Sequence, residues 1–387
     1  PKSLPETILP AGGFYNTQQR TMESYDFRAS ATYNTTIKDD HIINTYLGTE
    51  VNSQDRIFRW NDGWGMQYDS DLTPFWDYRA FKRLAEKNWD YYGLSKTYGR
   101  SAAFFANATY SYKGRYTLTG TTRYEGSNRL GRSRKARWLP TWNVSGAWNA
   151  HAEDFFEKQN LLSHFTLKAS YSLVGVAPSW VTNSRAIILS RAAWRPTAGQ
   201  SENRNYISSF ENEDLTYEKK HELNFGLDMG MLHNRVNIAA DIYWRNNFDL
   251  IGSAYTIGGT RWGNVAAMKS HGLELSVSTK NIQTKDFSWT TDFIFGSTFN
   301  KVTQLDTKRH MFNFLTGNGF ARQGYPVRSL FSIPFTGLDD EGFPTFMING
   351  KKVTRYNYGD INFQQIEDLD FLKYEGSSEP IYNGSLG

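Results

Sequence analysis

Residues 98–124, YGRSAAFFANATYSYKGRYTLTGTTRY, decide the fold of this chain. In its first arm every second residue is apolar or aromatic, and the residues between them are mostly small or hydroxylic. The alternation resumes at Tyr116, after the turn Lys113-Gly114-Arg115. Period-two alternation in two arms joined by a glycine turn predicts a β-hairpin. One apolar face and one small, polar face are typical of an outer-membrane barrel strand, and they also fit a soluble β-sandwich.

The same alternation recurs along the chain in ten or eleven arms. Beside this hairpin, arms are predicted near Tyr25, His41, Trp142, Phe165, Leu223, Val236, Leu273 and Trp289, with a last arm from Ile381. Six stretches are predicted to be irregular: residues 1–22, 62–97, 125–138, 175–214, 251–266 and 302–380. Within them, Pro74 to Asn88 has helix-like spacing and Phe343 to Ile348 is a short β-like piece. The connection 151–163 is predicted to contain one helical turn.

The connections between arms are short and long in strict alternation. The short ones are 38–40, 113–115, 151–163, 232–235 and 280–286, and the long ones are 62–97, 125–138, 175–214, 251–266 and 302–380. A transmembrane barrel has short periplasmic turns at one rim and long extracellular loops at the other. A soluble sandwich would instead show turn signals every ~8–12 residues, without this sorting. The connections therefore favour an all-β transmembrane barrel.

Ten or eleven strands do not close such a barrel. An open sheet in lipid would leave two edges of unpaired backbone groups, and closed single-chain bacterial barrels have even strand numbers. We therefore expect residues 1–387 to be part of one barrel domain whose remaining strands lie outside this sequence. The chain begins without a signal peptide, so either processing removed one or the sequence is an internal piece.

Composition excludes several classes of protein. Aromatic residues make up 16% of the chain while hydrophobic residues are only 39%, and no apolar run is long enough for a membrane-spanning helix. The absence of cysteine excludes disulfides and thiol chemistry. A net charge of +4 is too balanced to indicate a nucleic-acid partner. The sequence contains no HExxH, GxSxG, P-loop or GxGxxG motif, so we expect neither an enzyme nor a bound cofactor or metal.

Collinear motifs over about residues 22–387 resemble the SusC/RagA-like branch of the TonB-dependent outer-membrane transporters. They are YKGRY at 112–116, RYEGSNR at 123–129, RWLP at 137–140, GAW at 146–148, LKASYSLVG at 167–175, LTYE at 215–218, NFGLD at 224–228, NR at 234–235, DL at 249–250, MKSHGLEL at 268–275, GYPV at 324–327 and FTGLD at 335–339. Each motif is weak alone, and the set is specific. The family's plug domain, TonB box and first strands would precede Pro1, and its last strands would follow Gly387.

The resemblance implies the middle-to-late part of a barrel of about 22 strands when complete. The barrel would belong to an energised importer in the outer membrane of a Gram-negative, Bacteroidetes-like bacterium. Its ligands would be oligosaccharides or oligopeptides. A SusD-like surface lipoprotein would cap the extracellular face, the TonB–ExbB–ExbD complex would supply energy, and lipid and lipopolysaccharide would surround the wall. On family grounds, the 325–348 region is the candidate contact for the lipoprotein; the residues are Tyr325, Pro326, Phe335, Leu338 and Phe343.

Aromatic residues in the long loops are the candidate ligand contacts, because a flat amphipathic ring stacks on a sugar face or packs on a peptide side chain. Packing of loop against loop, or a place at the membrane interface, is the alternative for each ring. The candidates are Trp64, Trp76, Trp89, Trp180, Trp194 and Trp262.

Two charged segments have competing interpretations. The basic run from Arg129 to Arg137 is either a solvated loop tip or a site for lipopolysaccharide or an acidic ligand. Asp339-Asp340-Glu341-Gly342 is predicted to be a turn, because it lacks the spaced ligands and closing glutamate of a calcium loop.

A passive porin and a nutrient-binding surface receptor remain alternative functions. A porin needs no plug, so a plug encoded before Pro1 would discriminate the two.

Overall fold

The structure is a computed structural model, and it describes residues 12–68, 90–156, 161–177, 187–195, 200–257, 259–307, 310–361, 366 and 369–386. Its main element is an 11-stranded antiparallel sheet with the order β1-β2-β3-β4-β5-β6-β9-β10-β11-β12-β18. These strands are β1 (Gly13–Ile37), β2 (His41–Met66), β3 (Tyr92–Tyr112), β4 (Tyr116–Ser127), β5 (Trp138–Asn149), β6 (Leu162–Val176), β9 (Glu218–Met231), β10 (Val236–Thr256), β11 (Gly259–Gln283), β12 (Ser288–Leu305) and β18 (Tyr382–Leu386).

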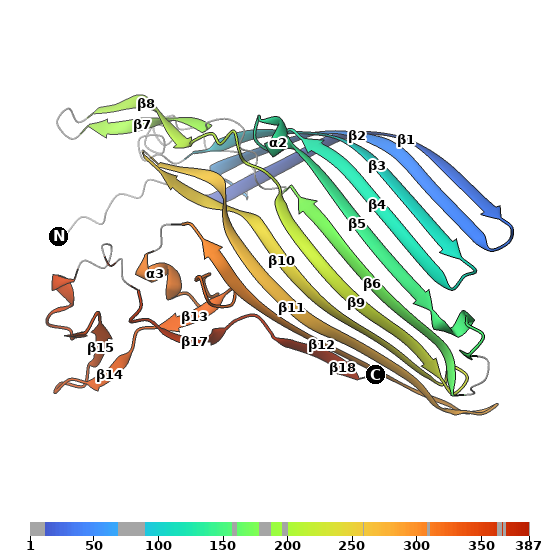
Figure 1. The fold of residues 1–387 in the computed structure, drawn as a ribbon. Coiled ribbons are helices and arrows are strands. Elements are labelled where there is room, and N and C mark those ends of the chain that lie inside the picture. The colour runs from blue at the N-terminus through green and yellow to red at the C-terminus, as the bar shows by residue number, and fades with distance from the viewer. Residues whose placement is uncertain are drawn as a thin grey trace.

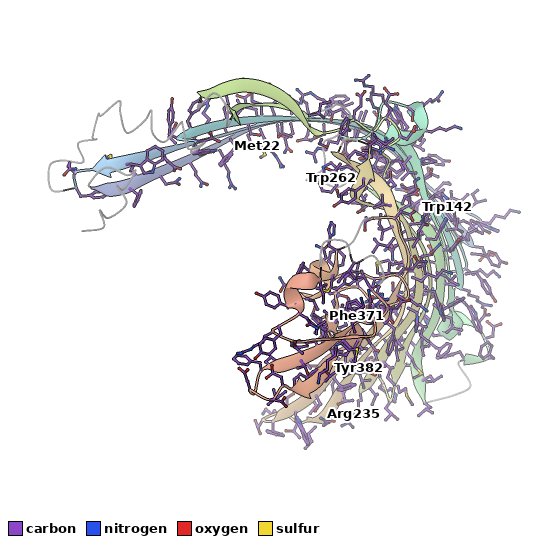
Figure 2. All side chains as sticks on the ribbon, turned by 90° about the vertical axis from the view of Figure 1, so that its left-hand side faces the viewer. Met22, Trp142, Arg235, Trp262, Phe371 and Tyr382 are labelled. Atoms are coloured by element: carbon purple, nitrogen blue, oxygen red, sulfur yellow. The ribbon has the colours of Figure 1, made fainter. Side chains whose placement is uncertain are left out.

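The sheet is strongly curved. Seen from the left-hand side of Figure 1, it forms a C with one concave and one convex face (Figure 2). In the described residues β1 and β18 are its two edges, so the barrel is not closed within this chain. Among the described helices, none has the length and apolar character needed to cross a bilayer. The predicted all-β barrel with ten or eleven strands is confirmed.

The register explains why one face is apolar. Residues directly opposite each other in neighbouring strands share a face. Leu167 lies opposite Trp148 on β5 and Leu227 on β9, and Leu227 in turn lies opposite Ala240 on β10. Trp142, Gly146 and Trp148 are separated by even numbers of residues along β5, so they share a face. Figure 2 shows Trp142 on the convex side of the sheet, whereas Met22 of β1 lies on the concave side. The convex face is therefore the apolar one, as the alternation predicts.

Several predicted boundaries were wrong because the strands extend beyond the apolar pattern. In the predicted irregular stretch 62–97, β2 runs on to Met66 and β3 already begins at Tyr92. Strand β1 begins at Gly13 rather than near Tyr25. Its residues 13–24, which lie farthest from the turn to β2, are mostly polar on both faces and therefore show no hydrophobic period. Residues 251–266 were predicted to be a loop, but β10 continues to Thr256 and β11 starts at Gly259. A register shift between Asn247 and Ile251, with Asp249 at φ 56°, interrupts the alternation there.

Smaller elements lie mainly at the long-loop end of the sheet, along the top and the left-hand side of Figure 1. A hairpin of β7 (Ile187–Arg195) and β8 (Gln200–Ser209) lies within 175–214, which was predicted to be irregular. The predicted helix at Pro74 to Asn88 falls outside the described residues. Other short elements are α2 (Arg134–Arg137), α3 (Met311–Phe314), β13 (Ser329–Ser332), β14 (Phe335–Leu338), β15 (Pro344–Ile348), β16 (Lys351–Val353), η3 (Tyr358–Asp360) and β17 (Lys373–Ser377), with η1 (Ala150–Ala152) at the short-turn end.

Hydrophobic cores lie outside the sheet rather than between layers. One cluster joins Leu130, Leu139, Leu215 and Tyr217 at the long-loop end. The other lies in the segment between β12 and β18, called the 306–381 lobe below, and consists of Met311, Phe314, Phe331, Leu369 and Leu372. Figure 2 places this lobe, with Phe371 labelled, on the concave side of the sheet.

Candidate functional site

Aromatic rows bound the apolar band on the convex face. On the hairpin β3–β4, Tyr112 lies opposite Tyr116 at the short-turn end, and Phe104 lies opposite Tyr124 toward the long-loop end. Eight residues separate the two pairs, about 26 Å along a strand at ~3.3 Å per residue, which a strand tilt of about 35–45° reduces to roughly 20 Å of height. Outer-membrane barrels carry an apolar band about 25 Å tall between two aromatic girdles. These rows therefore mark the membrane on this wall.

A charged cluster crosses the concave face of β1 to β4 around Phe105. The guanidinium carbons of Arg28 and Arg123 lie 5.2 Å and 5.9 Å from the centre of the Phe105 ring. Glu50 connects the two arginines, with N–O distances of 3.5 Å to Arg28 and 3.6 Å to Arg123. A Cβ at Gly48 would lie 2.4 Å from Phe105, so glycine leaves room for this ring. Four strands are thereby joined on the face that a ligand or plug would meet.

The loop after β4 and the loop before β9 are joined at the long-loop end and are called the rim below. The backbone N–H of Gly131 donates to Leu215 at 2.7 Å, and Arg132 reaches Glu211 at 3.5 Å and Glu213 at 3.4 Å. The basic run is thus not simply a solvated loop tip, because Arg132 joins two loops. The Tyr217 hydroxyl, in the loop before β9, donates to the Glu125 carbonyl at 3.2 Å. Burial raises the pKa of the Tyr217 phenol, which keeps it a neutral donor.

Asn264 of β11 joins this rim to the sheet. Its Oδ1 accepts from the backbone N–H of Thr216 at 3.0 Å, and its Nδ2 donates to the Thr216 carbonyl at 2.9 Å and the Asp249 carbonyl at 2.6 Å. Asn212 likewise donates to the Trp262 carbonyl at 2.9 Å. One side-chain amide therefore replaces the missing strand pairing at the irregularity in β10. Period counting could not have identified it.

Of the six predicted ligand-contact aromatics, the structure describes the side chains of Trp64 and Trp262, and these two lie apart. Trp64 lies in β2 and Trp262 in β11, seven positions apart in the sheet order. The Trp262 ring packs beside the cluster of Leu130 and Leu215, which is the loop-packing alternative. Trp194 belongs to β7, where no side chain is described. Trp76, Trp89 and Trp180 lie outside the described residues.

The base of the 306–381 lobe is organised around Arg322. This guanidinium is 13% exposed; it donates to Asp370 at 2.5 Å and lies over the rings of Tyr325 and Phe331 at 5.3 Å and 5.4 Å. The base is attached to β12, because Val302 donates to the Tyr325 carbonyl at 2.9 Å. Both ends of the lobe are therefore held at one place on the wall.

The distal part of the lobe is the three-stranded sheet β14–β15–β16, which exposes large apolar side chains. Phe335, Leu338 and Phe343 are 60%, 61% and 44% exposed. Arg355 lies 4.3 Å from the Phe343 ring and pairs with Glu341. The candidate lipoprotein contacts are thus divided, since the half-buried Tyr325 and Pro326 belong to the base and the other three to the distal sheet.

The predicted turn at Asp339 is confirmed. The Asp339 carboxylate accepts from the backbone N–H of Glu341 at 3.0 Å and of Phe343 at 2.8 Å, and Gly342 has φ 83°. In the part of the chain that the structure describes, no three His, Asp or Glu side chains gather in a metal-binding arrangement.

A carboxylate hub that no sequence motif predicted lies at the short-turn end. Glu153, just after η1, accepts from the Tyr116 hydroxyl at 2.5 Å, the Arg115 guanidinium at 3.0 Å and the Trp148 indole at 3.2 Å. The hydrogen bond from Tyr116, together with those from Trp148 and Arg115, holds the pKa of the Glu153 carboxyl below its usual range. An acidic residue in a short connection between aromatic arms is the only signal that could have identified this hub.

Comparison with known proteins gives consistent matches. The family model described as TonB dependent receptor-like, beta-barrel matches residues 7–370. TonB-dependent receptor P39 of Formosa agariphila is 25% identical over 345 residues, which are 86% of this chain and 31% of that relative. TonB-dependent receptor SusC of Bacteroides thetaiotaomicron is 28% identical over 211 residues, 52% of this chain and 21% of SusC. The chain thus spans less than a third of the length of these relatives.

Solved structures show the same fold. The structure of the RagAB peptide transporter superposes with a TM-score of 0.76 at 20% identity, over 96% of this chain and 40% of that chain. The RagAB peptide importer in its closed-closed state gives a TM-score of 0.74 at 21% identity, over 96% of this chain and 40% of the other.

Proposed function

Because this chain belongs to the TonB-dependent receptor-like β-barrel family, we propose that it forms the wall and outer loops of an energised importer of oligosaccharides or oligopeptides. The family consists of outer-membrane transport proteins rather than enzymes, so the predicted location and the absence of catalysis agree with this assignment. Residues 1–387 would belong to one barrel domain that surrounds a plug.

The observation that carries the proposal is the two-faced wall. Its convex face has an apolar band between aromatic rows, while its concave face holds charged groups around Phe105 and, at the long-loop end, the 306–381 lobe. A lipid-embedded wall with a polar interior suits passage of large polar ligands. Import by such a protein needs two states biased by ligand and by the TonB–ExbB–ExbD complex.

Uptake experiments test this function. Cells that express the complete protein should accumulate labelled oligosaccharides or oligopeptides, and loss of TonB should abolish accumulation. Uptake that persists without TonB would instead identify a passive porin. Surface binding without any uptake would identify a nutrient receptor. Alanine variants of Trp64, Trp194 and Trp262, and of Trp76, Trp89 and Trp180, would then show which rings contact the ligand.

We propose further that the distal sheet of the lobe contacts a SusD-like surface lipoprotein. Exposed Phe335, Leu338 and Phe343 beside Arg355 have the aromatic and arginine composition of protein interfaces. Replacing the three apolar residues with serine should abolish co-purification with the lipoprotein. The matched control is Phe155→Ser, equally exposed at the opposite end of the barrel. Undiminished co-purification of the triple variant would remove this assignment.

A further inference from the structure

Three arginines on the concave face at the long-loop end have no carboxylate partner in the part of the chain that the structure describes. They are Arg20 of β1, Arg56 of β2 and Arg129 of the loop after β4, and we call them the upper arginine patch. Among the described residues, no carboxylate lies within ion-pair distance of them. By contrast, Arg28, Arg100 and Arg123 each have one.

Register places Arg20 and Arg56 on the concave face. Arg56 lies directly opposite Met22, and Arg20 lies opposite Phe58 with its guanidinium carbon 5.2 Å from the Phe58 ring. Figure 2 shows Met22 on the concave side, and Arg20 is separated from it by one pleat of a strand without a bulge at this point. Both arginines are therefore exposed to the interior of the C.

Arg129 reaches the same face from a loop. Gly99 of β3 lies opposite Gln54, two residues from Arg56 along β2. A Cβ on Gly99 would lie 3.1 Å from the Arg129 guanidinium, so this guanidinium rests on the glycine. A side chain at position 99 would displace it. The basic loop thus contributes one cation to the concave wall, next to the strands that carry Arg20 and Arg56.

The patch lies beyond the membrane. Arg56 is opposite Thr97, which is seven residues from Phe104 on the side away from the apolar band. Other side chains near the patch on this face are uncharged hydrogen-bonding or aromatic groups such as Gln18, Gln54 and Trp60, apart from Asp26, which accepts hydrogen bonds from Ser24 and Asn52. Asp62 is the nearest acid at the end of β2, and it already accepts a hydrogen bond from Asn16. The uncompensated charge therefore faces the mouth of the barrel.

We propose that the upper arginine patch selects ligands that carry several carboxylate groups, such as acidic oligopeptides or uronate oligosaccharides. Guanidinium groups bind carboxylates through paired, charge-assisted hydrogen bonds. A concave wall of one charge also raises the local concentration of opposite charge. This inference rests on the proposed import function and adds the charge class of the ligand.

Binding to the complete protein in detergent tests the proposal, and it requires no transport. The probes are a glutamate oligopeptide against a glutamine oligopeptide of equal length, and a galacturonate oligosaccharide against a neutral one. Calorimetry at low salt should give at least about tenfold tighter binding of one acidic probe than of its neutral match, and this preference should fall at high salt. The pair that shows the preference identifies the source of the carboxylates.

The variant Arg20→Gln/Arg56→Gln/Arg129→Gln should lose the preference. Arg59→Gln is the matched control, because Arg59 lies on β2 with the opposite side-chain parity, and it should keep the preference. Circular dichroism and thermal unfolding would show that both variants fold. Equal binding of acidic and neutral probes by the wild type, or an unchanged preference in the triple variant, would overturn the inference. If neutral ligands are imported and no acid preference is found, the inference about ligand charge is wrong and the proposed import function is retained. If an acid preference is found without uptake, the proposed import function alone is wrong.

Discussion

The Arg115 guanidinium donates a hydrogen bond to the Glu153 carboxylate at 3.0 Å and, with its second nitrogen, one to Asp154 at 2.6 Å. Arg115 ends the turn between β3 and β4, while both carboxylates lie in the connection after β5. The pair therefore joins two neighbouring turns at the short-turn end. Tyr116 and Trp148, members of the aromatic row, donate to the same Glu153 carboxylate.

Stability should depend on the ionisation of Glu153. Its folded-state pKa is depressed, first by the Tyr116 hydroxyl. A group with a depressed pKa contributes stability above its unfolded pKa, about 4.3 for Glu, and that contribution is lost as pH falls through the folded value. Thermal unfolding in detergent should thus show wild type more stable than Glu153→Gln at neutral pH, with the difference vanishing in acid. A difference that is constant over this range would contradict the prediction.

Gly48→Ala should destabilise the wall. The new Cβ would lie 2.4 Å from the Phe105 ring and 2.9 Å from the Ala29 carbonyl, so the ring must move away from Arg28 and Arg123. Overpacking of this kind costs about 1–3 kcal/mol. Urea unfolding in lipid vesicles measures the free energy. Gly120→Ala is the control, because nothing lies within 4 Å of a Cβ there, and an equal cost for both would count against this mechanism.

The two faces should differ in their tolerance of charge. Val144 of β5 lies opposite Gly120 and Tyr171 on the apolar face, while its neighbour Ser145 lies on the concave face. Val144→Arg should cost roughly 2–4 kcal/mol of folding free energy in a bilayer. Ser145→Arg should cost far less, because its guanidinium would point to the polar interior. Equal costs, measured by folding titrations in vesicles, would mean that the convex face does not meet lipid.

Asn264→Ala should loosen the rim. The substitution removes the acceptor of the Thr216 N–H and the donor to the Thr216 and Asp249 carbonyls. Unpaired buried backbone groups cost about 1–3 kcal/mol, and the loop before β9 should open more often. Hydrogen exchange at the Thr216 amide should therefore accelerate. The control is Asn281→Ala at the opposite end of β11, which should leave that amide protected.

The predicted sorting of connections by length was only partly correct, because in the predicted loop 251–266 two residues separate Thr256 of β10 from Gly259 of β11. The arms of the large sheet and their two faces could be predicted from local residues. This was possible because lipid on one side and water on the other impose a period of two that local counting detects. The turn at Asp339 and the piece at Phe343 to Ile348 also followed from local residues, and β15 confirms the latter.

Tertiary structure decided the rest, because contacts between distant strands and loops leave no period. Beyond the membrane both faces of a strand contact water, so the first part of β1 has no apolar period and was not predicted. A register shift interrupts the alternation in β10, so the ends of β10 and β11 were not predicted either. Only the register across strands placed Arg20 and Arg56 on one face, and only loop packing turned Arg129 onto Gly99. The same holds for Asn264 and Glu153, because Thr216 and Arg115 are far from them in the sequence and come near only when neighbouring strands pair.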